Sequence, residues 1–480
     1  MHVLFAASEC APFVKTGGLA DVVGALPAAL AAEGVAVRVL LPGYPAVMAA
    51  LEGAVHVGEI AAPGGTARLV AGRAAGLDLI ALDAPALYGR PGGPYTDPGG
   101  KDWPDNHLRF GALSQASAAL AADGIAGWRP DVLHLHDWQT GLAPVYLHQR
   151  GGPRPATVLT IHNIAFQGLF PPAVIGPLGL ARAGFRQDGF EFWGKVGFLK
   201  GGLSLADRIT TVSPTYGREL MTPEFGMGLD GLMRHRRDAV TGILNGIDTR
   251  AWDPATDPAL PVPYSARAPG GKAVARRALE ARLGLPHDAG APILAVISRL
   301  TAQKGLDLLI EALPLLLARG GRLCVLGTGE AALEAAFRDA AEAHPGAVGV
   351  VIGFDEPLSR LIYGGADAIV IPSRFEPCGL TQLYGLRYGC LPLVARTGGL
   401  ADTVIDANPA ALAVGAATGF QFAPITAAAL GDALDRLMDI WADRPAWRRM
   451  MRRAMAQPVG WEVSAAAYRT LYEEIVRPPA

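Results

Sequence analysis

The sequence predicts an α/β protein with two doubly wound domains, each a mainly parallel sheet covered by helices. Short apolar runs alternate along the chain with longer stretches rich in Ala and Leu. The runs are apolar throughout, as expected of parallel strands covered on both faces. A proline-rich stretch separates two sets of these runs. Strand–helix–strand order repeated in each set predicts one doubly wound sheet per set.

The predicted strands share this apolar character and end in Gly, Ser or polar residues. In the first half they are residues 3–7, 38–41, 77–82, 132–136, 156–161 and 209–212. In the second half they are residues 293–297, 322–326, 348–352, 368–371 and 391–394. Helices are expected between them, at residues 19–33, 106–122, 305–319 and 330–343.

Residues 253–272 contain five prolines, which block helices and sheet ladders, so we expect a connector near a domain boundary. Residues 88–106 are irregular and rich in Gly and Pro, which is typical of a functional loop. Residues 461–475 have an amphipathic helical pattern.

Composition restricts the class of protein. The 480 residues include 42 Lys and Arg against 44 Asp and Glu, a net charge of −2, so a nucleic-acid partner is not expected. The four cysteines form no C-x-x-C pair, so we expect them to be reduced thiols of a cytosolic protein. The first residues predict a buried strand and not a signal peptide, and no apolar run approaches the ~20 residues of a membrane helix. We therefore expect a cytoplasmic protein without a membrane partner.

A six-residue sequence, Thr-Gly-Gly-Leu-Ala-Asp, occurs at residues 16–21 and again at 397–402, preceded by Lys15 and Arg396. Each copy follows a predicted strand and opens a helix. Glycine amides at a helix start can bind an anion, and the flanking base adds charge. The alternative is a tight strand-to-helix turn without a ligand.

Arg299 and Lys304 follow the predicted strand 293–297. Cations at the carboxyl end of a parallel strand lie where open α/β sheets bind ligands, so this pair is predicted to neutralise a diphosphate. The alternative is a pair of solvated surface cations.

Glu376 lies between Phe375 and Pro377, directly after another buried strand, and residues 378–381 open the next helix. A carboxylate here could bind sugar hydroxyls or a developing cation, or it could cap the helix. Cys378 has no neighbouring His in sequence, which disfavours a covalent role.

Two strands of the first half end in polar residues. His134 and His136 share one face of their strand, a spacing that could bind a metal, although core or capping roles fit better. Asp137 follows and is suited to holding a sugar hydroxyl. His162 closes the next strand, where a binding or catalytic role is favoured.

Residues 327–332 fit the Gly-x-Gly-x-x-Ala dinucleotide pattern, but Glu330 would repel a pyrophosphate at that helix start. This motif leaves an NAD-dependent oxidoreductase as one alternative function for the chain. A non-catalytic protein that binds a nucleotide sugar is a second alternative.

In this order along essentially the whole chain, the motifs resemble those of bacterial glycogen synthases, retaining glucosyltransferases related to starch synthases. The motifs with the most specific resemblance are residues 15–21, 134–138, 160–163, 213–216, 244–248, 298–307 and 373–385. The resemblance implies transfer of glucose from ADP-glucose to the nonreducing 4-OH of an α-1,4-glucan, without a cofactor or metal.

The resemblance also implies the GT-B fold, in which two Rossmann-like domains face a cleft. The domains are then expected at residues 1–243 and 244–460, with residues 461–480 returning to complete the first.

The roles that the resemblance implies follow residue by residue. Arg299 and Lys304 hold the donor diphosphate, and Glu376 is the essential carboxylate at the transferred sugar. His162 contacts that glucose, and Asp137 serves the acceptor. The residues implied in binding the donor are Lys15, Gly17, Gly18, Asp21, Asn163, Asn245, Phe354, Cys378, Gly379, Leu380 and Thr381.

One position departs from the pattern of many retaining GT-B enzymes. Tyr384 stands where these carry a second Glu, eight residues after the first. This is as expected for the bacterial glycogen synthase branch, but a two-carboxylate scheme cannot be carried over to this chain.

Overall fold

The computed structural model describes residues 1–63 and 65–476, and the chain divides into two compact units. The first contains residues 1–245 and the segment from 461 onward, and the second contains residues 246–460. This division lies two residues after the expected boundary at 243/244. Residues 477–480 of the segment expected to return to the first domain lie outside the described residues.

The first unit is built on a nine-stranded sheet in the order β12-β11-β7-β6-β1-β2-β5-β4-β3. Its strands are β1 (His2–Ala6), β2 (Ala36–Pro42), β3 (Glu52–Ala62), β4 (Gly65–Ala74), β5 (Leu77–Asp83), β6 (Val132–His136), β7 (Ala156–Ile161), β11 (Arg208–Thr211) and β12 (Val240–Gly242). A separate antiparallel sheet has the order β8-β10-β9, with β8 (Leu169–Phe170), β9 (Glu191–Phe192) and β10 (Lys195–Gly197).

One edge of the first unit's sheet is antiparallel, in residues 52–74, for which no strand was predicted. Strands β3 and β4 form an antiparallel hairpin, and β4 also pairs antiparallel with β5. Most residues of β3 are exposed, so this segment lacks the continuous apolar run that marks a buried parallel strand. The remaining strand pairs of the sheet are parallel.

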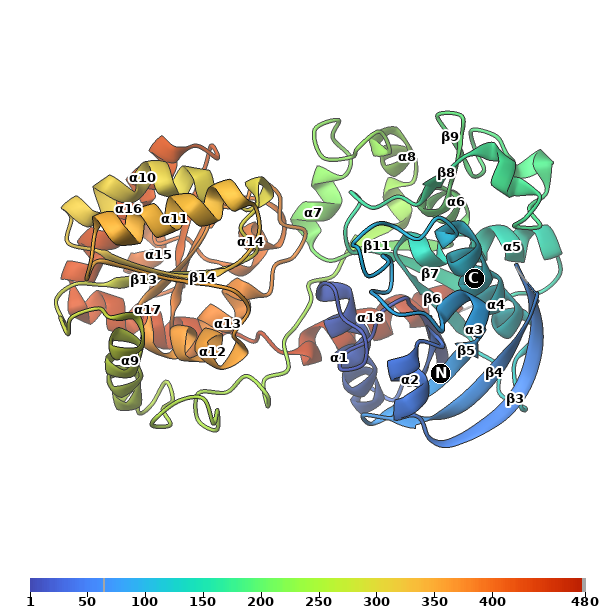
Figure 1. Cartoon of the computed structure of the whole chain (residues 1–480), viewed down its shortest axis with the longest axis horizontal. Helices are drawn as coiled ribbons and strands as arrows, with labels where there is room; N and C mark the ends of the chain where they lie inside the picture. The colour runs from blue at the N-terminus through green and yellow to red at the C-terminus, as the bar shows by residue number, and fades with distance from the viewer. Residues whose placement is uncertain (64, 477–480) are drawn as a thin grey trace. The chain divides into compact units, whose positions relative to one another are not determined.

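Helices of the first unit follow its strands and cover the sheet. They are α1 (Gly18–Ala32), α2 (Pro45–Ala50), α3 (Pro85–Tyr88), α4 (Asn106–Asp123), α5 (Ala143–Arg150), α6 (Phe198–Leu205), α7 (Pro214–Glu219), α8 (Asp230–His235) and α18 (Trp461–Val476). The C-terminal helix α18 packs beside the N-terminal helix α1 (Figure 1). Ser464 of α18 also donates a hydrogen bond to the Leu244 carbonyl. The amphipathic pattern at 461–475 is therefore the helix that completes the first unit.

The second unit has a wholly parallel six-stranded sheet in the order β15-β14-β13-β16-β17-β18. Its strands are β13 (Ile293–Ile297), β14 (Arg322–Gly327), β15 (Val348–Ile352), β16 (Ala368–Ile371), β17 (Leu391–Ala395) and β18 (Phe420–Phe422). Its helices are α9 (Gly270–Leu283), α10 (Leu306–Ala318), α11 (Ala331–Ala343), α12 (Glu356–Gly365), α13 (Thr381–Tyr388), α14 (Gly398–Thr403), α15 (Pro409–Ala413), α16 (Ala427–Ala442) and α17 (Arg444–Met455). The predicted connector is irregular up to Pro269, and its last three residues, 270–272, begin α9.

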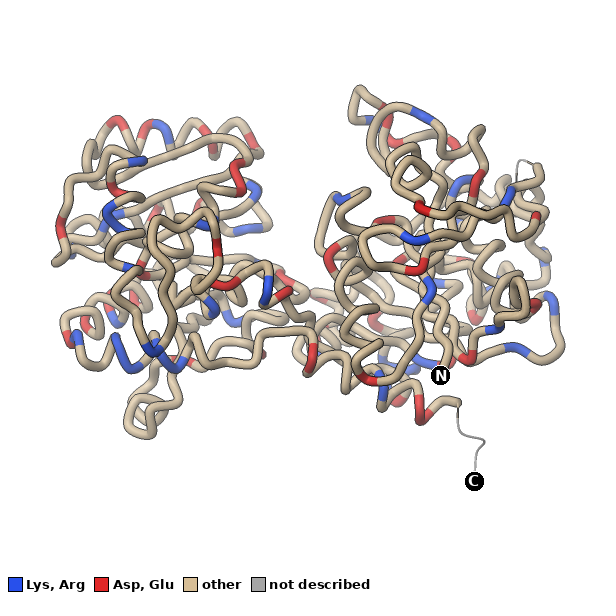
Figure 2. Tube along the Cα trace, turned by 90° about the horizontal axis from the view of Figure 1, so that it is seen from below, with Lys and Arg blue, Asp and Glu red and all other residues tan. Residues whose placement is uncertain are grey.

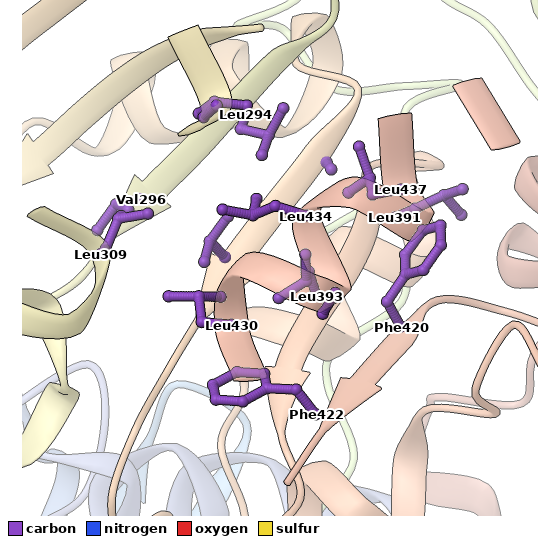
Figure 3. Packing of buried hydrophobic residues seen from close by; sticks show 14 of the residues in the cluster. Leu294, Val296, Leu309, Leu391, Leu393, Phe420, Phe422, Leu430, Leu434 and Leu437 are labelled. Atoms are coloured by element: carbon purple, nitrogen blue, oxygen red, sulfur yellow. The ribbon is translucent and has the colours of Figure 1, made fainter. Parts of the chain in front are cut away.

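Helices cover both faces of this sheet. Helices α10, α11 and α16 lie on one side, and α9, α12, α13 and α17 on the other (Figure 1). On the first side, Leu430 and Leu434 of α16 pack with Leu393 of β17 and Phe420 of β18 (Figure 3). Burial of both sheet faces explains why these strands are apolar at nearly every position.

Charge is dispersed over the molecule. Lys and Arg residues are interspersed with Asp and Glu along the trace (Figure 2), in keeping with the net charge of −2. Among the described residues, no helix has both the length and the apolar character needed to cross a bilayer.

Leu434 provides a test of the core of the second unit, because its side chain is 0% exposed in the cluster of Figure 3. Leu434→Ala should lower the free energy of unfolding of this unit by about 2–5 kcal/mol, since a cavity is left behind. Denaturant unfolding followed by circular dichroism would measure the loss. Val414→Ala, at a side chain 79% exposed, should change stability by less than about 0.5 kcal/mol. Equal effects of the two variants would contradict this packing.

Candidate functional site

In the second unit, the predicted site residues converge where strand order reverses. Strand β13 lies between β14 and β16, so the chain proceeds from β13 in one direction and later continues at β16 on the other side. The carboxyl ends of strands flanking such a reversal form the usual ligand crevice of α/β sheets. Arg299 and Lys304 follow β13, and Glu376 follows β16.

Glu376 is the buried centre of this edge. Its carboxylate accepts a hydrogen bond from Lys304 Nζ at 2.6 Å and another from Ser373 Oγ at 2.9 Å. The Glu376 side chain is 11% exposed and the Lys304 side chain 19%. A buried carboxylate needs such partners, because desolvation of an unpaired charge is costly. The structure thus joins two predicted residues 72 positions apart in sequence.

Two glycines allow the loops around Glu376 to pack closely. A Cβ on Gly305 would lie 2.0 Å from the Pro372 carbonyl oxygen, and one on Gly398 would lie 1.9 Å from that of Glu376. Gln303 also donates a side-chain hydrogen bond to the Phe375 carbonyl. These contacts fix the segment after β13 against the segment after β16.

The second copy of the repeated sequence therefore has a structural role. Gly399 N–H donates to the carbonyls of Glu376 and Pro377. The expectation of an anion site at this copy is wrong for that amide, because it is already bonded within the protein.

The Gly-x-Gly turn after β14 is filled by the protein's own chain. A Cβ on Gly327 would lie 2.0 Å from the Ser298 carbonyl oxygen, and one on Gly329 would lie 2.2 Å from that of Leu300. Glu330 accepts a hydrogen bond from Ala302 N–H at 2.9 Å. This turn supports the loop that carries Arg299, which is itself exposed, and it does not form a dinucleotide cradle.

The other predicted residues of this unit are placed differently. Cys378 is buried, Gly379 has a φ of +73°, and Leu380 and Thr381 lead into α13 directly after Glu376. Phe354 follows β15, which β14 separates from β13, and its side chain is 89% exposed. The structure brings Cys378–Thr381 to the Glu376 loop but does not bring Phe354 to it.

In the first unit, the corresponding edge lies at the carboxyl ends of the adjacent strands β1, β6 and β7. The loop after β1 carries Glu9, Lys15 and the glycines Gly17 and Gly18. Asp137 follows β6, and His162 and Asn163 follow β7. The strand order reverses at β1, as it does at β13 in the second unit.

Glu9 is a central residue of this edge that the sequence analysis missed. Its side chain is buried, and its carboxylate accepts hydrogen bonds from Thr16 N–H at 2.5 Å, Thr16 Oγ1 at 2.6 Å and Gly17 N–H at 3.4 Å. Tyr95 O–H, from the irregular segment before α4, donates to the same carboxylate. An acid three residues after a buried strand and eight residues before a Gly-Gly turn was the available signal.

Gly17 and Gly18 are exposed, with open space where a side chain would begin. Lys15 lies beside them, 52% exposed, and pairs with Asp21 Oδ1 at 2.7 Å. The first copy of the repeat thus presents an accessible base and a glycine turn, whereas the second copy is packed against the Glu376 loop.

Asp137 and His162 are linked through the backbone. Asp137 Oδ1 accepts a hydrogen bond from His162 N–H at 2.7 Å. Burial raises the pKa of Asp137 to about 7 and lowers that of His162 to about 3. The imidazole is therefore neutral near pH 7, and the carboxyl group can exchange a proton there.

His134 and His136 are buried core residues. His134 shares hydrogen bonds with Tyr472 of α18 at 2.7 Å and with Thr160 at 2.6 Å, so both of its ring nitrogens are engaged. His136 Nδ1 lies 3.0 Å from His162 Nε2. This cluster of three imidazoles connects the return helix to the strand ends.

The side chains of Asn163 and Asn245 are placed differently, although the Asn163 backbone N–H donates to the Asp137 carboxylate. Asn163 Oδ1 accepts from Ala165 N–H within its own loop. Asn245 is buried at the last residue of the first unit's main segment.

The imidazole cluster predicts acid lability of the first unit. Burial lowers the pKa of His134 and His162 to about 3 and that of His136 well below its usual value. Below about pH 6.5 the three histidines of the unfolded chain bind protons, whereas those of the folded cluster stay neutral. Asp137 has the opposite effect, because its raised pKa lets the folded state hold one proton between about pH 4 and 7 that the unfolded chain does not hold. Stability should therefore fall as pH drops below about 6.5.

Calorimetry between about pH 7 and about pH 5, in buffers of different ionisation enthalpy, would measure this effect. Unfolding at about pH 5 should take up about two protons through these four groups, and His134→Gln should reduce that uptake by about one. If the midpoint temperature of unfolding of the first unit did not change over this pH range, the lowered pKa values of the three histidines would be contradicted.

Two family models match the chain. One, described as the starch synthase catalytic domain, matches residues 2–235, and the other, glycosyl transferases group 1, matches residues 280–454. The chain is 61% identical to a glycogen synthase from Roseobacter denitrificans, over 99% of this chain and 100% of that protein. It is 57% identical to a glycogen synthase from Paracoccus denitrificans, over 98% and 99% of the two chains.

Solved structures agree with these relatives. The catalytic domain of starch synthase IV from Arabidopsis thaliana, bound to ADP and acarbose, superposes with a TM-score of 0.87 at 31% identity, covering 99% of both chains. A sucrose-phosphate synthase from Thermosynechococcus elongatus, at 18% identity and a TM-score of 0.59 over 98% of both chains, shares the fold. With its full-length match to these relatives and two Rossmann-like units of the GT-B type, the chain belongs to the glycogen synthase family of glycosyltransferases.

Proposed function

We propose that this enzyme transfers glucose from ADP-glucose to the nonreducing 4-OH of an α-1,4-glucan, retaining the α configuration and releasing ADP. The observation that carries the proposal is the Lys304–Glu376 pair at the strand reversal of the second unit, with Arg299 exposed on the preceding loop. Membership of the glycogen synthase family supports the choice of donor and acceptor.

Arg299 and Lys304 stabilise the leaving group in this proposal. Negative charge develops on the β-phosphate of ADP as the bond between C1 and oxygen breaks, and preorganised donors lower the free energy of that state. One Lys304 hydrogen engages Glu376, and an ammonium group has three, so the others are available to a phosphate oxygen. Arg299 offers a planar fork to the same diphosphate.

Glu376 acts at the transferred sugar. The anomeric carbon gains positive charge in an oxocarbenium-like transition state, which a nearby carboxylate stabilises. Ser373 and Lys304 hold this carboxylate in one orientation, so little reorganisation is needed during the reaction.

The first unit supplies groups for the glucose and the acceptor. Neutral His162 is assigned to hydroxyls of the transferred glucose. Asp137, whose pKa is raised to about 7 by burial, is assigned to the acceptor hydroxyl, which must lose a proton. Lys15, Asp21, Gly17 and Gly18 are assigned to the nucleotide sugar, together with Asn163, Asn245, Phe354 and Cys378–Thr381.

We place the enzyme in the cytoplasm. Cys10, Cys324, Cys378 and Cys390 are all buried free thiols, the state expected of structural cysteines in a reducing compartment.

Competition between donors tests the proposed reaction. ADP-, UDP- and GDP-glucose would be offered separately and together with glycogen, and incorporated glucose would be scored. We expect incorporation from ADP-glucose to dominate. Preferred incorporation from UDP-glucose would overturn the donor assignment, and release of ADP without growth of the glucan would overturn the transferase assignment.

Arg299→Ala and Lys304→Ala should each lower kcat about a hundredfold or more, because one preorganised donor is worth about 3–4 kcal/mol in the transition state. Initial rates at saturating ADP-glucose would measure the loss. Arg250→Ala is the matched control, since this arginine is 88% exposed on the same unit and has no assigned role. Near-normal turnover in either active-site variant would remove that residue from diphosphate binding.

Glu376→Gln should retain the fold and the affinity for ADP yet lose most turnover. The amide keeps the size and one acceptor oxygen of the carboxylate but not its charge, which stabilises the positive sugar. Calorimetric titration with ADP and rate measurements separate binding from chemistry. Normal turnover with unchanged ADP affinity would exclude Glu376 from the reaction.

A further inference from the structure

Exposed apolar side chains gather around the small sheet of the first unit. Phe166 is 62% exposed, Trp193 is 81% exposed and Met227 is 46% exposed. With the half-buried Phe192, these residues are called here the aromatic patch. Exposed apolar groups that cluster in this way mark binding surfaces, whereas single exposed residues do not.

Several contacts join the members of the patch. Gln167, next to Phe166, donates a hydrogen bond to the Met227 carbonyl at 3.1 Å. A Cβ on Gly228 would lie 3.2 Å from the Phe192 ring and 3.6 Å from Trp193 Nε1. The segments 166–168, 192–193 and 227–228 therefore meet on one surface.

Backbone conformation singles out two of these residues. Trp193 and Gly194 form the two-residue turn between β9 and β10, with φ values of +50° and +75°. Met227 also has a positive φ, +47°. Such turns favour Asn-Gly, and a bulky residue with positive φ is unusual. A Trp at a strained, solvent-exposed turn points to a function for its ring there.

A packed aromatic layer anchors the patch to the strand ends. Gly168 approaches the ring of Trp138, the residue after Asp137, and the rings of Phe170 and Phe198 lie 5.9 Å from it. Phe166 lies four residues after His162, and its N–H donates to the Asn163 carbonyl. The patch is thus continuous with the loop assigned to glucose.

We infer that the aromatic patch binds a stretch of the α-1,4-glucan chain away from its reacting end, an inference that rests on the proposed function. The four patch residues carry no charge and the flanking Glu191 and Lys195 have opposite charges, which suits a neutral polysaccharide better than a nucleic acid or an anionic membrane surface. Glucose rings present C–H faces that stack on aromatic rings, and hydroxyl edges that the Gln167 amide can meet.

Trp193→Asn tests the inference without disrupting the turn, because Asn-Gly is the favoured pair for this geometry. The Kd for maltoheptaose, measured by calorimetry without a donor, should rise about three- to tenfold. The KM for glycogen should rise in parallel, with kcat and the KM for ADP-glucose unchanged. Trp193→Tyr should retain most of the affinity for maltoheptaose. Val414→Asn, at an exposed apolar residue of the second unit, should bind maltoheptaose as the wild type does.

Unchanged affinity and KM in Trp193→Asn would overturn the inference, as would wild-type protein that does not bind maltoheptaose. A dimer in sedimentation velocity that Trp193→Asn dissociates would also overturn it, because the patch would then bind a second copy of the chain. If the wild type fails to extend glycogen but Trp193→Asn still weakens maltoheptaose binding, the proposed reaction fails and the glucan site stands.

Discussion

Parallel strand pairing is the constraint on which the sites of both units depend. It directs the carboxyl ends of β1, β6 and β7 to one edge in the first unit, and those of β13 and β16 to one edge in the second. Residues far apart in sequence, such as Lys304 and Glu376, meet only because their strands are aligned in this way. The helices and the apolar core serve largely to hold these strands in register.

Each unit has a buried carboxylate at this edge, and different hydrogen-bond donors offset the cost of burying its charge. Glu9 is bonded mainly by the backbone and hydroxyl of Thr16, whereas Glu376 is bonded by an ammonium and a hydroxyl group. The Thr-Gly-Gly repeat follows the same division. Its first copy is fastened to Glu9 and leaves Gly17 and Gly18 open, and its second copy packs on the Glu376 loop. The same six-residue sequence thus forms an accessible glycine turn in the first unit and supports the Glu376 loop in the second.

Most parallel strands and the return helix could be predicted from the sequence, because continuous apolar runs and an amphipathic period are local signals. The β3–β4 hairpin could not, because β3 is mostly exposed and β4 is only partly buried, so neither has such a run. Lys304 and Glu376 were both identified, but their pairing depends on loop packing that Gly305 and Gly398 permit. Glu9 and the Trp193 surface were missed, since burial of an acid and exposure of an aromatic ring appear only in three dimensions.

The contribution of α18 to the first unit has a consequence for biosynthesis. Tyr472, the partner of His134, is encoded after the whole second unit, so the first unit lacks a buried hydrogen bond until residues 246–460 have been translated. The second unit is continuous from 246 to 460, and its whole sequence leaves the ribosome earlier. The usual order in which N-terminal domains finish folding first is therefore reversed, and premature termination would damage the unit made first.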